Sequence, residues 1–371
     1  MKRRDFVSGL GLATLGACAT GPALPAATST SPQLPPVKSS MDRVTRTVVG
    51  LRPYRPEGYR LDSEQLGEKT IVHNYGHGGC GVTMSWGTAT VAADMASAPR
   101  AREIAVLGCG VQGLTSALIL ARRGHDVTIY AADLPPHTTS NVAGVLWLPT
   151  GYFDEDVATP QFHELDRKLI RLAYYGFLPY VNRPGYGVYW ADHYTLGRRV
   201  PTTRNELPGG DDIYPQLRTS TSGNLFGYAY QERFNALIIA PDYYLDAILK
   251  DAQIAGAKVV RQAFGSIDDV MALKESVVVN CTGLGAGALF GDESLRPIKG
   301  QLTHLLPQPE ITYSYIAPTS EGTLYMFPRK TGLVLGGTHQ LGVSTMEPDP
   351  AQITRMVTGH AALADRLGAL A

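Results

Sequence analysis

The stretch that decides the fold is "EIAVLGCGVQGLTSALILARRGHDVTIYA", residues 103–131. An apolar strand at its start runs into three glycines, Gly108, Gly110 and Gly113, and apolar residues then recur at helical spacing. A second strand at residues 126–131 completes the unit. A strand, a glycine turn, a helix and a strand in this order indicate a parallel sheet, so we expect an α/β protein.

Each of the three glycines has its own role at this spacing. The first allows a tight turn, the second lets a pyrophosphate approach the backbone, and the third lets the helix pack closely on the strand. The N–H groups at the start of the helix then face the phosphates. The pattern predicts a dinucleotide site without distinguishing NAD from FAD. An acid after the second strand commonly binds the ribose, and here only Asp133 is available, with a surface aspartate as the alternative interpretation.

The rest of the chain alternates short elements in the way expected of an α/β protein, and it contains no internal repeat. We expect further strands at residues 258–260, 276–280, 323–327 and 332–338, and helices at residues 242–255, 268–274 and 351–367.

Composition limits the range of functions. The chain has 371 residues, and 33 lysines and arginines balance 33 aspartates and glutamates, so nothing favours a nucleic-acid partner. Three of the four cysteines, Cys80, Cys109 and Cys281, match no metal-binding spacing and are odd in number. We therefore expect buried free thiols at these positions.

Residues 1–40 are predicted to be a targeting segment and a flexible tether. The paired arginines of "MKRRDF" precede a short apolar run, which is the pattern of twin-arginine export. The string "LGAC" resembles the box at which bacterial lipoproteins are lipidated, here on Cys18, and cleavage near Ala27 is the alternative. We therefore expect a periplasmic protein or one anchored to a membrane surface by a lipid.

The stretch "IVHNYGHGGCGVTMSWGTA", residues 71–89, carries two histidines four residues apart, His73 and His77. That spacing alone is a weak metal signal, and no further ligand set accompanies it. We expect no metal site and interpret both histidines as structural supports.

Several long strings resemble D-amino acid oxidases, which are FAD enzymes of the glutathione-reductase-like type. The resemblance covers nearly all of residues 48–367. The strings are "VLGCGVQGLTSALILARRGHDVTIYAADLPPHTTSNVAGVLWLPTGY", "VVVNCTGLGAGAL", "RPIKGQ", "YMFPRKTGLVLGGTHQLG", "GLRPYRP" and "HNYGHGGCGVTMSWG".

The resemblance implies an FAD-dependent oxidase that moves a hydride from the Cα of a D-amino acid to flavin N5 and uses molecular oxygen. In that family the flavin carries the chemistry, so no catalytic side chain is assigned. Arg52 and Tyr325 match the residues that bind the substrate carboxylate, and Gly79 matches the carbonyl that accepts the amine. The matching cofactor residues are Thr138, Thr139 and Ser140 of the threonine-rich loop and Gly78, Gly81, Val82 and Thr83 at the start of a helix, beside Gly108, Gly110, Gly113 and Asp133.

One departure from the family concerns the order of the motifs. "GLRPYRP" and "HNYGHGG" close the chain in the family, whereas here they precede the glycine turn. The sequence therefore resembles a circular permutation in which residues 41–98 are the moved C-terminal part and residues 97–102 join the old termini. We expect a Rossmann-like FAD-binding domain from residues 41–160 and 241–300, and a mixed-sheet substrate domain from residues 161–240 and 301–371.

Two further departures bear on the substrate. Leu148 replaces a glutamine that the family often has, and Glu321 stands where a lid tyrosine is expected, so the lid differs or is absent. A neutral or apolar D-amino acid is the first expectation, and Glu321 would favour a cationic side chain if it faced the pocket. A flavin oxidase or dehydrogenase of another amine or N-substituted amino acid, and a non-catalytic flavin-binding surface protein, stay open as alternatives. A homodimer and attachment to a membrane through Cys18 also stay open.

Overall fold

The structure of the protein is a computed structural model that describes residues 34–370. The predicted twin-arginine signal at Arg3 and Arg4, lipidation at Cys18 and cleavage near Ala27 all fall outside these residues. Within residues 34–370, none of the helices combines the length and the apolar character needed to cross a membrane.

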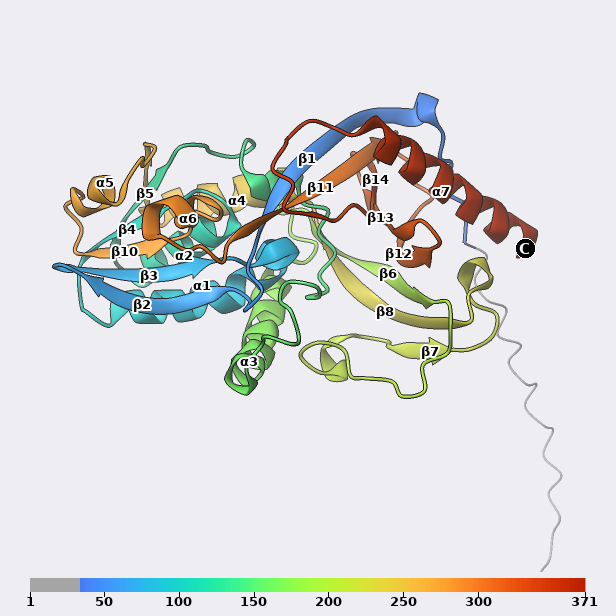
Figure 1. Ribbon diagram of the computed structural model, residues 1–371, viewed down its shortest axis with the longest axis horizontal. Coiled ribbons are helices and arrows are strands. Elements are labelled where there is room, and N and C mark those ends of the chain that lie inside the picture. Colours follow the sequence, from blue (N-terminus) through green and yellow to red (C-terminus); the bar gives the residue numbers. More distant parts are fainter. Residues whose placement is uncertain (1–33, 371) are drawn as a thin grey trace, which may run out of the picture. The chain divides into compact units, whose positions relative to one another are not determined.

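A six-stranded sheet forms the first layer (Figure 1). All neighbouring strands in it are parallel except β2 and β3 at one edge. The central parallel strands β4 and β10 are short and almost entirely apolar, as expected of strands covered on both faces. Its strands, in spatial order, are β2 (Arg60–Leu66), β3 (Lys69–Tyr75), β10 (Val277–Asn280), β4 (Glu103–Leu107), β5 (Asp126–Ala131) and β9 (Lys258–Arg261).

A nine-stranded mixed sheet forms the second layer, and β1 and β11 lie at the edge nearest the first layer (Figure 1). Its neighbouring strands are antiparallel, except that β12 and β6 are parallel. Its strands, in spatial order, are β1 (Val44–Tyr54), β11 (Arg296–Leu305), β14 (Gly332–Gly336), β13 (Gly322–Arg329), β12 (Tyr313–Thr319), β6 (Val188–Gly197), β8 (Tyr230–Ile239) and β7 (Arg218–Ser220), with β15 (Gln340–Leu341) paired to β11.

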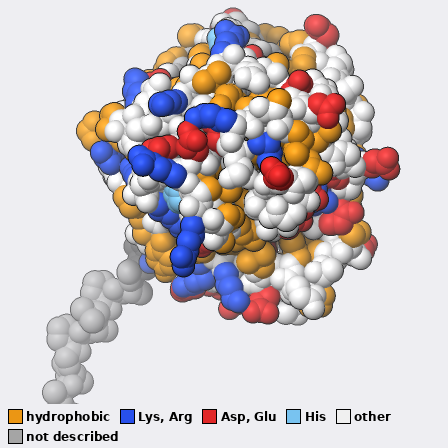
Figure 2. Space-filling view, turned by 90° about the vertical axis from the view of Figure 1, so that its left-hand side faces the viewer, with side chains coloured by type: hydrophobic (Ala, Val, Ile, Leu, Met, Phe, Trp, Pro, Cys, Tyr) orange, Lys and Arg blue, Asp and Glu red, His pale blue; other side chains and the backbone are white. Residues whose placement is uncertain are grey.

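Helices cover both sheets. Among the α-helices, α1 and α2 pack on the six-stranded sheet, α4 packs against α2, and α7 packs against β11, β13 and β14. On the face at the left of Figure 1, positive and negative side chains are interspersed (Figure 2), in keeping with the zero net charge. The helices are α1 (Gly81–Ser97), α2 (Val111–Arg122), α3 (Pro160–Phe177), α4 (Pro241–Ile254), α5 (Ile267–Met271), α6 (Gly285–Phe290) and α7 (Pro350–Leu370), with 3-10 turns η1 (Met41–Arg43), η2 (Gly78–Cys80), η3 (Thr139–Val142), η4 (Leu178–Tyr180), η5 (Asp211–Ile213) and η6 (Leu225–Gly227).

The predicted strand, glycine turn, helix and strand unit is confirmed, because β4, α2 and β5 occupy residues 103–131. The other predicted elements are also present, with ends within about four residues of those expected. The position of β1 differs from the expected layout, because it pairs with β11 in the nine-stranded sheet although it lies in the segment 41–160 assigned to cofactor binding. The proposed domain division otherwise stays a prediction.

Helices α1 and α3 cross at two glycines that allow close contact. A Cβ at Gly87 of α1 would overlap the carbonyl of Leu169, and a Cβ at Gly176 of α3 would overlap the side chain of Trp86. These contacts fix the position of α1 relative to α3. The beginning of the same helix lies at the cavity described below.

We expect the substitution Gly87→Ala to lower the free energy of unfolding by ~1–3 kcal/mol, because the added methyl has no room between the helices. Urea unfolding measures this change. Gly285→Ala is the matched control, since its Cβ would meet its nearest neighbour at an ordinary 3.5 Å. Equal stability of the two variants would contradict the close crossing.

Candidate functional site

A cavity of about 780 Å³ opens where the parallel strands β4, β5 and β10 end. The carboxyl ends of such strands are the usual place for a ligand in an α/β fold. From there the cavity extends to β1, β11 and β13 of the nine-stranded sheet, whose side chains line its other end. Every site residue predicted from the sequence lines this cavity except Gly113, whose expected role is packing.

The glycine turn has the geometry that its spacing predicts. Gly108 has a φ of +100°, a conformation that side chains rarely adopt, and a Cβ there would lie 2.6 Å from the Cys281 carbonyl oxygen. A Cβ at Gly113 would overlap the carbonyl of Gly108, so helix α2 packs directly on the turn. Gly110 faces the cavity at the start of α2, and its backbone is open to a ligand.

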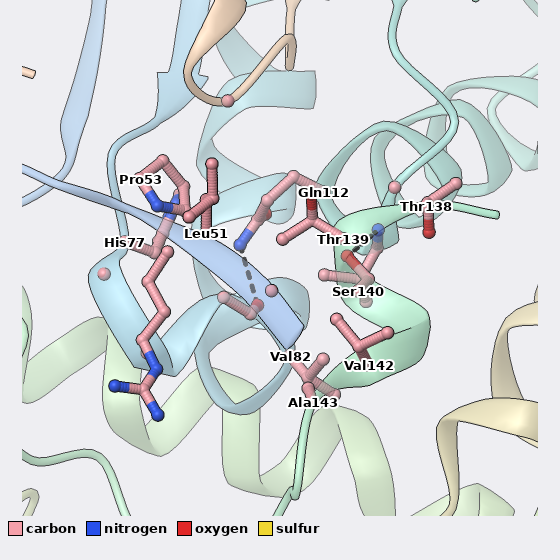
Figure 3. Close-up of a pocket in the computed structure, with 18 of the residues that line it drawn as sticks. Leu51, Pro53, His77, Val82, Gln112, Thr138, Thr139, Ser140, Val142 and Ala143 are labelled. Atoms are coloured by element: carbon pink, nitrogen blue, oxygen red, sulfur yellow. Dashed lines mark hydrogen bonds between the residues drawn. The ribbon is translucent and has the colours of Figure 1, made fainter. Parts of the chain in front are cut away.

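The threonine-rich loop closes over this turn (Figure 3). The backbone N–H of Val111 donates to the Ser140 hydroxyl at 3.0 Å, and the Thr138 hydroxyl donates to the Asn141 side chain at 2.8 Å. Thr138, Thr139 and Ser140 all line the cavity. The Ser140 hydroxyl is therefore placed beside the first N–H group of α2.

A second helix also begins at the cavity. Gly81, Val82 and Thr83 form the first turn of α1, and Gly78 precedes it with a φ of +53°. The N-cap residues, Cys80 of α1 and Gly110 of α2, give no side-chain cap hydrogen bond, and in α2 the Ser140 hydroxyl takes the first N–H. Two positive helix ends therefore face one cavity, which favours an anionic ligand.

Gln112 links the two helix ends by hydrogen bonds. Its amide donates to the Gly81 carbonyl at 2.9 Å (Figure 3). Its oxygen accepts from Thr88 at 3.0 Å and from Asn74 at 3.2 Å. Gln112 is not among the site residues predicted from the sequence. The available signal was a polar residue between the second and third glycines, at a position that faces the interior.

Hydrogen bonds hold both histidines, His73 on β3 and His77 just before η2. His73 contacts Glu64 at 2.8 Å and Asn280 at 3.1 Å, and His77 contacts Thr88 at 3.2 Å. These contacts agree with the predicted supporting role. Within residues 34–370, no three His, Cys, Asp or Glu residues are grouped so as to hold a metal ion.

Burial lowers the pKa of His77 from 6.5 to about 3, because the charged form loses its hydration. His77 is therefore neutral near pH 7, and its ring stacks on Tyr59 with centroids 5.2 Å apart. A neutral ring adds no charge to the cavity, which leaves the helix ends and Arg52 as its positive features.

The predicted substrate residues meet at the far end of the cavity. A Cβ at Gly79 would lie 3.4 Å from Cδ of Arg52, so the turn before α1 touches the guanidinium arm. One guanidinium N–H donates to the Thr338 carbonyl at 3.2 Å. Gly300 on β11 leaves room for Arg52, since a Cβ there would lie 2.7 Å from the guanidinium. Tyr325 lines the same end from β13, and its hydroxyl has no hydrogen-bond partner among residues 34–370.

Asp133 and Glu321 occupy different settings. Asp133 follows β5 at the margin of the cavity, with its side chain 63% exposed and 4.0 Å from Arg261. Glu321 lies in the tight turn between β12 and β13, is exposed, and does not line the cavity. Glu321 therefore does not face the pocket, and it gives no reason to expect a cationic substrate side chain. Leu148 does line the cavity, as an apolar wall.

The three cysteines of the described chain are buried and free, as predicted. Cys80 lines the cavity, and its thiol donates to the Thr150 carbonyl at 3.2 Å. Burial raises the pKa of Cys80 to about 12, so it stays a thiol.

Comparison with known proteins identifies the family of the chain and similar folds. The sequence model of the family described as FAD dependent oxidoreductase matches residues 17–95 and 103–368. A D-amino-acid oxidase from Streptomyces coelicolor is 34% identical over 265 residues, covering 70% of this chain and 77% of that protein. A D-aspartate oxidase from Homo sapiens is 29% identical over 255 residues, covering 66% of this chain and 71% of that protein. Among solved structures, glycine oxidase from Geobacillus kaustophilus has a TM-score of 0.52 at 18% identity, covering 72% of this chain and 80% of that one.

The low pKa of His77 predicts a loss of stability in acid. Between pH 6.5 and about pH 3 the unfolded chain takes up a proton on this residue that the folded chain does not, so the free energy of unfolding falls as the pH falls. In His77→Gln we expect this slope to be smaller by ~1.4 kcal/mol per pH unit at most. Urea unfolding at several pH values measures the slope, with exposed His163→Gln as control. Identical slopes in all three proteins would show that His77 is not held neutral.

Proposed function

Because the chain belongs to the family of FAD-dependent oxidoreductases, we propose that it is an oxidase of D-amino acids. The reaction consumes the amino acid, molecular oxygen and water, and it yields a 2-oxo acid, ammonia and hydrogen peroxide. Relatives named D-amino-acid oxidase support this substrate class. The observation that carries the proposal is the contact between Arg52 and Gly79 at the end of the cavity away from the glycine turn.

The cavity fits FAD, the cofactor of the family, in shape and in charge. Gly108 and Gly110 leave the backbone at the start of α2 free of side chains, and Ser140 lies beside it. The two helix ends supply N–H donors and positive potential. In this assignment Gly108, Gly110, Asp133, Thr138, Thr139 and Ser140 would hold the dinucleotide part, and Gly78, Gly81, Val82 and Thr83 would lie along the flavin.

We assign the substrate carboxylate to Arg52 and Tyr325. A guanidinium presents parallel N–H groups that match a carboxylate, and the bond to Thr338 holds the arm in place. The Tyr325 hydroxyl, which has no partner among the described residues, is available as a further donor. Both groups are partly buried, which strengthens a charge-assisted hydrogen bond relative to one in water.

The amine is assigned to the backbone carbonyl of Gly79, next to the guanidinium. With its two ends held there, the substrate has one orientation in which its Cα hydrogen can face the cofactor. Bound FAD would supply the hydride acceptor for that carbon. The N-terminus of α1 favours negative charge nearby, and a substrate amine that enters neutral requires no side-chain base.

The walls around this end of the cavity favour a neutral or apolar substrate side chain. Leu51, Leu148, Ile316 and Phe327 line it, and the ring of Phe327 stacks on that of Tyr325 at 4.9 Å. The hairpin that joins β12 and β13 turns between Thr319 and Gly322, which pair with each other, so a long lid cannot start from it.

The circular permutation is also a proposal. The family model matches in two segments that break between residues 95 and 103, where α1 is joined to β4. The hydroxyl of Ser39 donates to the Val357 carbonyl of α7 at 2.8 Å, so the segment before β1 lies beside the last helix. This proximity supports a direct connection between the two in the unpermuted order.

A chain that begins at Glu103, continues to residue 371, and returns through a flexible linker to residues 34–98 tests the permutation. We expect it to fold and to bind FAD, because the join at residues 98–102 carries no site residue. Circular dichroism and the visible flavin spectrum measure both. A reordered chain that stays unfolded, beside a native-order control that folds, would contradict the proposal.

Export by the twin-arginine route, lipidation at Cys18 and a homodimer also stay proposals. Fractionation of cells that express the Arg3→Lys, Arg4→Lys double variant tests export, and loss of the periplasmic or membrane-bound pool is the expected result.

Labelling with palmitate tests lipidation at Cys18, with Cys18→Ser as control. Analytical ultracentrifugation gives the oligomeric state.

Arg52→Met tests the carboxylate assignment. We expect kcat/KM for the preferred D-amino acid to fall about 10³-fold, because a charge-assisted pair is lost, while the FAD content is unchanged. Arg46→Met on the same strand is the control, since that arginine pairs with Asp242 at the surface. Normal kinetics in Arg52→Met would show that the carboxylate binds elsewhere.

A substrate panel separates the proposal from its alternatives. D-amino acids with neutral, acidic and basic side chains, their L-enantiomers, and N-methyl glycine are each added with oxygen present, and peroxide is measured. Neutral D-amino acids should give the highest yield. Peroxide from the N-substituted substrate alone would favour the amine oxidase alternative, and a flavin that no substrate reduces would favour a non-catalytic protein.

A further inference from the structure

A second cavity, of about 620 Å³, lies at the far end of the nine-stranded sheet. Its walls come from η6, the turn between β12 and β13, and helix α7, which runs along this end of the sheet (Figure 1). No part of the proposed reaction uses it. It is separate from the first cavity, because no residue lines both. On β13, Thr323 and Tyr325 face the first cavity and Leu324, between them, faces the second.

Positive charge dominates this second cavity. Three arginines line it, Arg198, Arg355 and Arg366, against a single acid, Glu321. None of the three arginines forms an ion pair with a carboxylate in the part of the chain that the structure describes. Arg198 and Arg366 both lower the pKa of Tyr228 against the rise caused by its burial, so both cations lie close to that side chain.

The floor of the second cavity is apolar. Phe226, Leu324 and Leu363 line it and are buried. Phe226 has a φ of +55°, which is costly for a bulky residue, and its ring is held against Tyr315 at 5.0 Å. The second cavity therefore combines an apolar floor with guanidinium ions that form no ion pair with a carboxylate of the described residues.

Arg355 connects the second cavity to the first. Its guanidinium donates to the Glu321 carbonyl at 3.2 Å and to the Gly337 carbonyl at 2.9 Å. Gly337 precedes Thr338, whose carbonyl accepts the hydrogen bond from Arg52. An anion that draws Arg355 toward itself would therefore loosen the backbone that positions Arg52.

We propose that this cavity binds a phosphate monoester with an apolar body, and that its binding weakens substrate binding at the first cavity. Guanidinium groups match the oxygens of a phosphate dianion, and the apolar floor accepts the ester chain. The effect on the substrate rests on the proposed function, whereas binding itself does not. Since coupling between two sites is reciprocal, the substrate weakens binding of the phosphate ester by the same factor.

Calorimetry with hexyl phosphate on the FAD-loaded protein tests binding. We expect saturable binding, at least about tenfold tighter than that of inorganic phosphate because of the apolar contact. The double variant Arg198→Gln, Arg366→Gln should weaken it at least about tenfold, which is the loss expected for two charge-assisted contacts. Arg199→Gln is the matched control, because Arg199 is exposed next to Arg198 and does not line the cavity.

Absence of binding, or equal weakening by Arg199→Gln, would overturn the site. Equal affinity for inorganic phosphate would overturn the apolar part of the ligand. Vesicles that contain phosphatidate distinguish the source of the phosphate: sedimentation with them that the double variant loses would assign a lipid headgroup, and binding of hexyl phosphate alone a soluble ester.

Kinetics test the coupling. Saturating hexyl phosphate should raise KM for the D-amino acid severalfold with little change in kcat, and the double variant should not respond. An unchanged KM in the wild-type protein would overturn the coupling but not the site. If no D-amino acid is oxidised, the proposed function fails, and the calorimetric result still decides whether the cavity binds the ester.

Discussion

The meeting of two helix N-termini at one cavity is the constraint on which the rest of the structure depends. Helices α1 and α2 both begin there without a side-chain cap from their own N-cap residues, and Gln112 joins them by donating to Gly81 at 2.9 Å. Unpaired N–H groups and positive helix ends have to be satisfied by water or by an anionic ligand. A cofactor with a pyrophosphate and an electron-accepting ring can place negative charge at both helix ends, which is why FAD suits this fold.

The remaining architecture holds these helix ends in place. Close contact between α1 and α3 at Gly87 fixes one helix, and the contact of Gly113 with the glycine turn fixes the other. The nine-stranded sheet then brings Arg52 and Tyr325 to the opposite end of the cavity. Residues that lie before and after the glycine turn in the sequence thus contribute to one site, so the unusual order of the motifs is compatible with a single active centre.

The sequence predicts the glycine turn, its flanking strands and the substrate arginine because each depends on local spacing or on long motifs. It does not predict that β1 pairs with β11 in the larger sheet, because that pairing joins segments about 250 residues apart and leaves no local pattern. Gln112 was missed for a similar reason, since its partners Gly81, Thr88 and Asn74 come from other elements. The exposed position of Glu321 depends on the tightness of a hairpin, which the residue itself does not encode.

The central claim is that a D-amino acid held by Arg52 and Gly79 delivers a hydride to bound FAD. The most direct measurement is the visible spectrum of the purified protein under anaerobic conditions, before and after addition of D-alanine and then of L-alanine. The account predicts a yellow protein whose flavin absorbance is bleached by D-alanine and unaffected by L-alanine. A colourless protein, or a flavin that no D-amino acid bleaches, would contradict it.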